Sequence, residues 1–113
     1  MAKFSLLDIE NPLGRREETG GEIFETLVEK TGFRLLRIVS TGQATPPGEW
    51  YDQGDDEWVV VIAGSAGLRV EDDPETTTLG PGEGVHLPAH KRHRVEWTDP
   101  DRPTVWLALH FDA

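Results

Sequence analysis

The chain has 113 residues, no cysteine, and 21 acidic against 11 basic side chains, so its formal net charge is −10. This length predicts a single domain over residues 1–113, and the lack of cysteine excludes disulfides, a thiol nucleophile and cysteine-bound metal centres. The negative charge argues against nucleic acid and anionic membrane as partners. No segment has the pattern of a secretory signal or the length of a membrane span, so we expect a cytoplasmic protein.

The N-terminal part predicts an irregular segment followed by a hairpin. Residues 1–22 are expected to be mostly irregular, because 10–22 form a polar stretch with proline and glycine. Residues 23–29 and 33–40 are rich in Ile, Phe, Leu and Val and flank a Lys-Thr-Gly turn, which predicts two paired strands. A short helix over 22–30 is the alternative.

The clearest strand is predicted at residues 57–64, a short and β-branched run that ends in a glycine turn. Side-chain alternation divides it into two faces, one with Glu57, Val59 and Val61 and the other with Trp58, Val60 and Ile62. Both faces are mostly apolar, so we expect both to be covered.

Further short strands are predicted in the second half, separated by Asp, Pro and Gly turns. In the strand over 93–97, alternation places His93, Val95 and Trp97 inside and Arg94 and Glu96 outside. About eight or nine short strands joined by hairpin turns predict an all-β fold, an antiparallel double sheet or barrel. The other strands are expected at 68–71, 76–79, 85–88 and 104–111.

Two ionisable side chains are expected inside this barrel. Glu57 opens an apolar strand on its inner face, and His93 shares an inner face with Val95. A buried carboxylate and a buried imidazole are costly unless each has a partner. A shared metal ion or a hydrogen-bonded acid–base pair would satisfy both.

These residues also fall within motifs that resemble those of the cupin superfamily. The span 57–64 matches the E-x6-G half of the family's first motif, and 82–93 matches the second motif, G-x5-P-x-G-x2-H, with His90 where glycine is usual. The resemblance extends over a first-motif region at 42–64 and a second-motif region at 82–97. It implies an antiparallel double-stranded β-helix, or jelly-roll barrel, and a fold that hosts many activities.

The sequence departs from this pattern where the family carries most of its metal ligands. The H-x-H pair of the first motif is missing, and its places are taken by Trp50 and Asp52 or, in the other register, by Tyr51 and Gln53. Trp97 stands where the second motif ends in asparagine. The resemblance therefore carries over Glu57 and His93 as metal ligands and catalytic groups, and Asp52 is an inferred replacement ligand.

Two more histidines, His90 and His110, are possible further ligands, whereas His86 is expected to be exposed and inert. A mixed nitrogen and oxygen site suits Fe(II), Mn(II) or Zn(II), and no organic cofactor is implied. Four aromatic residues could line a substrate pocket: Trp50, Tyr51, Trp97 and Trp106. The basic cluster at 90–94 could attract a carboxylate or phosphate group, although a solvated turn is the simpler interpretation.

The sequence leaves two main functional hypotheses open. The first is a metal-dependent cupin that oxidises or isomerises a small organic acid, sugar or polyol. The second is a metal-free cupin that binds a small-molecule ligand without catalysis, which the missing H-x-H pair favours. A structural dimerisation module is a third, but it leaves Glu57 and His93 unexplained. Small domains rarely expose an apolar face like the one with Trp58, so either the N-terminal hairpin or a second copy of the chain should cover it. We predict a homodimer, because cupins, which the sequence resembles, commonly pair through such sheets.

Overall fold

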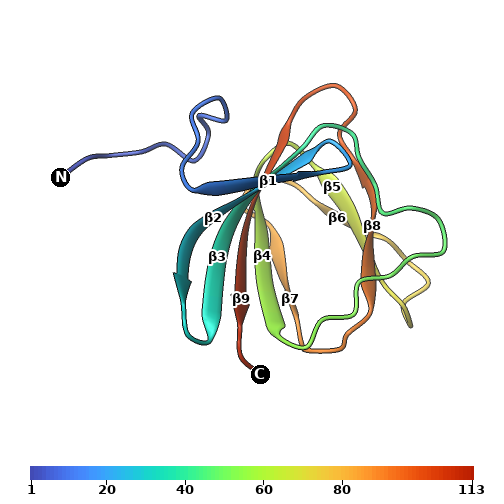
Figure 1. The fold of residues 1–113 in the computed structure, drawn as a ribbon. Coiled ribbons are helices and arrows are strands. Elements are labelled where there is room, and N and C mark those ends of the chain that lie inside the picture. The colour runs from blue at the N-terminus through green and yellow to red at the C-terminus, as the bar shows by residue number, and fades with distance from the viewer.

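The computed structural model describes residues 1–113 and contains only β-strands, so the predicted all-β class is confirmed (Figure 1). It contains no helix that could cross a membrane. The strands are β1 (Arg15–Thr19), β2 (Glu22–Lys30), β3 (Phe33–Ser40), β4 (Asp56–Ala63), β5 (Ala66–Val70), β6 (Thr77–Leu79), β7 (Gly84–Leu87), β8 (His93–Thr98) and β9 (Thr104–Phe111).

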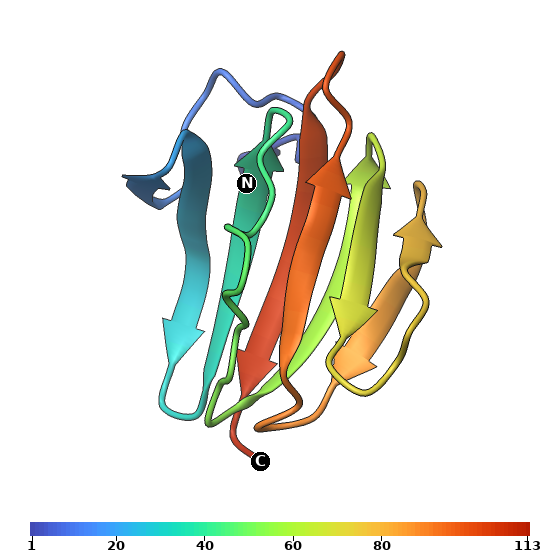
Figure 2. The ribbon, with the colours of Figure 1, turned by 90° about the vertical axis from the view of Figure 1, so that its right-hand side faces the viewer.

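The strands form two antiparallel sheets that pack face to face (Figure 2). The larger sheet has the order β1-β2-β3-β9-β4-β7, and the smaller has the order β6-β5-β8. The last strand of the chain, β9, lies in the middle of the larger sheet, between β3 and β4. The main buried core lies between the sheets and comprises Val59, Val61, Ala66, Leu68, Leu79, Leu87, Trp106 and Ala108.

Two strand predictions are confirmed, one of which had a helix as its alternative. Residues 22–30 form a strand rather than a helix and pair with β3. On β4, the residues Glu57, Val59 and Val61 are 7%, 3% and 0% exposed. Alternation along an apolar strand therefore correctly identified the face that turns inward.

The expectation that residues 10–22 form only a loop is wrong, because five of them form β1. This strand pairs with β2 from Arg15 opposite Thr26 to Thr19 opposite Glu22. All of its residues are polar and exposed, so it carries no hydrophobic alternation. The turn that joins it to β2 consists of Gly20 and Gly21, both with positive φ (60° and 88°), a two-glycine hairpin signal that could have indicated the strand.

The predicted inward position of Trp97 is also wrong. On β8, Val95 pairs with Leu68 and Trp97 pairs with Gly67, so Glu96 is an extra residue without a partner on β5. Such a bulge reverses the alternation beyond it. The Trp97 ring consequently lies over Gly67 and is 37% exposed.

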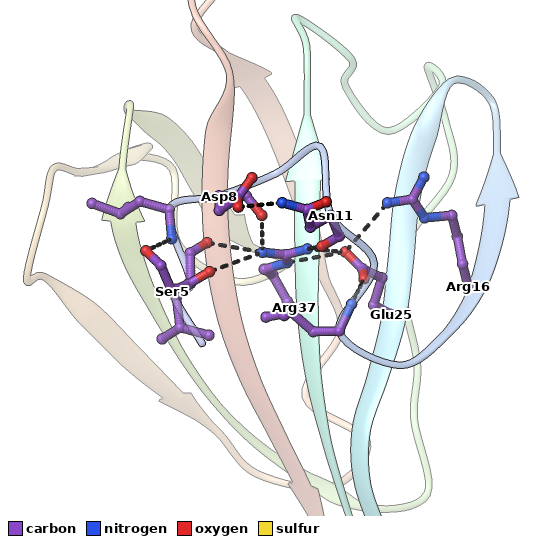
Figure 3. A network of polar contacts seen from close by, with 9 residues as sticks. Ser5, Asp8, Asn11, Arg16, Glu25 and Arg37 are labelled. Atoms are coloured by element: carbon purple, nitrogen blue, oxygen red, sulfur yellow. Dashed lines mark hydrogen bonds and ion pairs between the residues drawn. The ribbon is translucent and has the colours of Figure 1, made fainter. Parts of the chain in front are cut away.

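The outer face of the larger sheet carries a buried ion pair that holds the N-terminal segment, residues 5–13 (Figure 3). Arg37 on β3 contacts Glu25 on β2 at 2.5 Å, and both side chains are fully buried. The Arg37 guanidinium also donates hydrogen bonds to the backbone oxygens of Leu6, Asp8 and Asn11. Glu25 accepts a hydrogen bond from the backbone N–H at position 13. The pair thus fastens an otherwise irregular segment to the sheet.

Candidate functional site

A cavity of about 370 Å³ opens between the two sheets, which is within the size range of small-molecule sites. One wall is apolar, with Phe24, Leu36, Ile38 and Trp106 contributed by β2, β3 and β9. The polar lining comes from strands of both sheets and from the segment before β4: Glu17, Thr19, Glu22, Arg34, Thr45, Tyr51, Gln53, Glu57, His93 and His110.

Glu57 lies at the centre of the polar lining. Its Oε1 is 3.7 Å from Nε2 of His93, and its Oε2 is 3.7 Å from Nε2 of His110. Glu57 is 7% exposed, and no hydrogen bond to its carboxylate occurs in the structure. A nearly buried carboxylate without donors is unfavourable unless a proton or a cation neutralises it.

The other nitrogen of each histidine is engaged elsewhere. Nδ1 of His93 is 2.9 Å from the backbone oxygen of Lys91, which can only accept, so Nδ1 carries a proton, and in the neutral ring Nε2 then holds the lone pair. Nδ1 of His110 is 3.4 Å from a carboxylate oxygen of Asp55, which favours the same tautomer. In the neutral form of both rings, two imidazole lone pairs therefore face the Glu57 carboxylate.

This donor set fits a divalent cation chemically. Metal-binding histidines usually donate their second N–H to a carboxylate or backbone oxygen, as His93 and His110 do here. Ligand atoms roughly 2.0–2.2 Å from a metal lie about 3.0–3.5 Å apart, slightly closer than the 3.7 Å separations observed. No group of three or more His, Asp and Glu side chains has the closed geometry of a metal site in the structure.

The structure places Asp52, the inferred replacement ligand, outside this group. Its carboxylate pairs with Nδ1 of His90 at 2.8 Å, and both side chains are well exposed. His90 is the one non-glycine residue with positive φ (63°), a conformation that explains why glycine is usual at this motif position. The neighbour Gln53 lines the cavity instead. His86 is exposed, as expected, and pairs with Asp56.

The aromatic residues expected at the pocket separate into two groups. Tyr51 and Trp106 line the cavity, and the Tyr51 ring stacks on His93 with 5.5 Å between centroids. Trp50 lies outside the cavity. The guanidinium groups of Arg69 on β5, Arg94 on β8 and Arg92 in the loop before β8 lie within 6.0 Å of its ring centre. Trp97 is displaced by the bulge in β8.

The charged groups around Tyr51 affect its hydroxyl. Partial burial raises the pKa of Tyr51, and the negative charges of Glu22 and Glu57 raise it further. A hydrogen bond with Thr45 acts in the opposite direction but does not cancel the increase. The Tyr51 hydroxyl therefore remains protonated and available as a donor over the ordinary pH range.

Sequence reasoning did not identify Arg34, which lines the cavity from β3. It pointed instead to the basic cluster at 90–94, where Lys91 pairs with Asp72 and Arg92 pairs with Glu71. The available signal was Arg34 within an apolar strand, the same kind of signal that identified Glu57 on β4.

Comparison with protein families decides the classification of this fold. The family model described as "Cupin domain" matches residues 36–110, which extend from within β3 through most of β9 and include Glu57, His93 and His110. The chain belongs to the cupin family. The motif resemblance noted in the sequence is thereby confirmed. No curated protein matches the chain.

Several solved cupin structures resemble this one. A protein from Ralstonia eutropha JMP134, whose suggested activity is that of a mannose-6-phosphate isomerase, is 48% identical with a TM-score of 0.88, and 100% of each chain is covered. The polyketide cyclase RemF from Streptomyces resistomycificus is 21% identical with a TM-score of 0.72, covering 100% of this cupin and 80% of RemF.

A third structure names the fold. It is an RmlC-like cupin with a double-stranded β-helix from Methanocaldococcus jannaschii, 17% identical with a TM-score of 0.66, and 87% of this chain and 89% of that chain are covered. The double-stranded β-helix predicted from the motifs is therefore confirmed.

Proposed function

We propose that this cupin binds a divalent cation through Glu57, His93 and His110 and acts on a small organic acid, sugar or polyol by oxidation or isomerisation. One observation carries the proposal. The Glu57 carboxylate has no hydrogen-bond donor and faces two Nε2 atoms at 3.7 Å each. Such an arrangement of lone pairs is stabilised by a positive charge between them.

A bound Fe(II), Mn(II) or Zn(II) ion would act as a Lewis acid toward a substrate oxygen. The residues of the chain supply the rest of the site. The Tyr51 hydroxyl can donate a hydrogen bond to a substrate oxygen, and Glu57 or a histidine can accept a proton from an adjacent carbon or hydroxyl. The apolar wall of the cavity binds the body of the substrate and excludes water.

The Ralstonia protein supports the isomerase branch of this proposal, because its suggested activity is the isomerisation of a sugar phosphate. The structures that are about 20% identical support only the shared fold. Oxidation and isomerisation therefore both remain within the proposal.

The alternative function is metal-free binding of a small molecule, with Glu57 and His93 as hydrogen-bonding groups. Its specific support is the absence of a closed group of three ligands, together with the missing H-x-H pair. In this case the ligand would supply the hydrogen-bond donors that the Glu57 carboxylate lacks.

Metal analysis distinguishes the two functions. We expect close to one divalent ion per chain in untagged protein prepared without chelator, lost in His93→Ala and in Glu57→Gln. His86→Ala is the matched control, because His86 pairs with Asp56 away from the cavity, and it should retain the metal. A chelator should also lower the melting temperature of the wild-type protein.

Protein that stays metal-free after incubation with Fe(II), Mn(II) and Zn(II) would contradict the metal-dependent proposal and favour the binding function. Loss of metal from the His86 variant as well would show that the ion lies elsewhere.

A further inference from the structure

Arg34 is a cation in the cavity without an acidic partner. It is the sole Arg or Lys among the residues that line the cavity, and none of its nitrogens lies within 4 Å of a carboxylate oxygen. Every other arginine of the chain has such a partner. In a protein with 21 acidic and 11 basic side chains, an unpaired arginine in a cavity is unusual and suggests that its partner is a ligand.

The strand register places Arg34 in line with Glu57 and His110. Glu57 on β4 pairs with His110 on β9, and His110 pairs with Arg34 on β3. Directly paired residues point to the same face of a sheet, with their Cβ atoms roughly 5 Å apart. Arg34, His110 and Glu57 therefore form one row across three neighbouring strands, which we call the inner row. On β2 the residue opposite Arg34 is Glu29, but its carboxylate pairs with Arg15 and not with Arg34.

We propose that Arg34 binds the carboxylate of a small monocarboxylic acid, whose apolar body lies along the Phe24 and Trp106 wall. The guanidinium would hold the two carboxylate oxygens through paired hydrogen bonds. The neighbouring carbons of the acid would then lie beside His110 and Glu57. The position of these reactive carbons rests on the proposed function, whereas carboxylate binding by Arg34 does not.

The charges of the cavity favour a carboxylate over a phosphate. Three acidic residues, Glu17, Glu22 and Glu57, line the same cavity as this single guanidinium. In the metal-free protein, a phosphate monoester, which carries about −1.5 to −2 charge at neutral pH, would be repelled by these carboxylates, because only one guanidinium offsets them. A carboxylate carries a single charge and matches one guanidinium in shape. The inference therefore selects organic acids from the wider class proposed above.

Calorimetric titration of metal-free protein tests the inference directly. The probes are acetate, hexanoate, phenylacetate and cinnamate, with phenylacetamide as the neutral counterpart and phenyl phosphate as the phosphate. We expect at least one carboxylate with an apolar body to bind, and phenylacetamide to bind at least tenfold more weakly than phenylacetate.

Matched variants assign the effect to the side chain. Arg34→Gln should weaken carboxylate binding at least tenfold, and Arg34→Lys should give an intermediate loss because lysine cannot form the paired contact. Arg102→Gln is the control, since Arg102 is exposed and pairs with Asp99. Thermal melting of each variant verifies that it is folded.

The inference is overturned if no carboxylate of the panel binds in an Arg34-dependent way, or if phenyl phosphate binds more tightly than every carboxylate. Metal content is measured on the same Arg34 variants and should be unchanged, because arginine is not a ligand. Arg34-dependent binding to protein that takes up no metal would support this inference and contradict the proposed metal chemistry. Protein that binds metal but no carboxylate would support the proposed metal chemistry and contradict this inference.

Discussion

At the scale of single residues, Tyr51 reports on the charge of the candidate site. Its ring stacks on His93, and the negative charge of Glu57 is one of the causes of its raised pKa. It is the one tyrosine of the chain. Its ionisation can therefore be followed by ultraviolet absorbance without interference from another phenol.

We expect the Tyr51 pKa to lie above its ordinary value of 10.0 and to fall toward that value in Glu57→Gln, because a nearby negative charge is removed. The folded state holds this proton more tightly than the unfolded chain does. The resulting contribution to stability is present below the ordinary pKa and is lost as the pH rises through the raised value. An unchanged pKa in Glu57→Gln, with His86→Ala as control, would contradict the placement of Glu57 beside the ring.

The residues of the site differed in how well the sequence could predict them. Glu57 and His93 were predictable because each is an ionisable residue at an inward position of an apolar strand. Trp97 was not, because one extra residue at Glu96 reverses the alternation. Arg34 carried the same signal as Glu57, but β3 also carries Arg37, and the pairing of whole strands shows that Arg34 faces the cavity and Arg37 the N-terminal segment.

At the scale of elements, the pair of Arg37 and Glu25 joins β2, β3 and the N-terminal segment. Burial raises the pKa of Glu25, but the Leu13 N–H and the Arg37 charge outweigh it, so the net pKa lies below the ordinary value. The strand β1 follows directly after this segment. Its position beside β2 is thus supported from both sides, by the Gly-Gly turn and by the anchored segment. This polar anchoring left no hydrophobic signal in the sequence.

We expect Arg37→Met to destabilise the protein by about 3–5 kcal/mol, because it leaves Glu25 buried without its cation. The double variant Glu25→Leu/Arg37→Met should lose less than the single one. Arg15→Met, at an exposed pair with Glu29, should change stability by less than about 1 kcal/mol. Denaturant unfolding measures each value, and equal losses in the single and double variants would argue against the buried-charge explanation.

The same pair gives a pH dependence. Because the folded-state pKa of Glu25 is lowered, its contribution to stability is present above the ordinary value of about 4.5. It is lost as the pH falls through the lowered value. Unfolding curves recorded over this acidic range should therefore converge for the wild-type protein and the double variant.

At the scale of the whole molecule, the overall fold was the most predictable property, since short alternating strands and frequent turns suffice to indicate it.

The outward face of β4, which carries Trp58, is not covered by any other part of the chain. The hairpin of β2 and β3 belongs to the same sheet as β4 and does not pack over the outward face of that strand. Trp58 on this face is 48% exposed. The register surrounds Trp58 with other outward-facing apolar residues: Phe33, Leu35, Val60, Leu107, Leu109 and Phe111. We call this set the outer apolar patch.

The homodimer expected from the sequence remains a prediction, and the outer apolar patch is the surface on which we expect it to form. Sedimentation at micromolar concentration should show about twice the chain mass of 12.6 kDa, and Trp58→Lys should shift the protein toward the monomer because it places a charge within the patch. Thr78→Lys is the control, because Thr78 is exposed on β6 in the smaller sheet, away from the patch. A wild-type species of 12.6 kDa would contradict the prediction.

The central position of β9 determines when the binding site can come into existence. During synthesis, β3 and β4 leave the ribosome before the strand that joins them, so both expose unpaired edges that favour aggregation. Their pairing with β9 spans much of the chain, which slows folding relative to local contacts. Because His110 lies on β9, closure of the sheet and assembly of the inner row occur in the same event. A nascent chain that lacks this strand is therefore both unable to bind its ligand and exposed to misassembly.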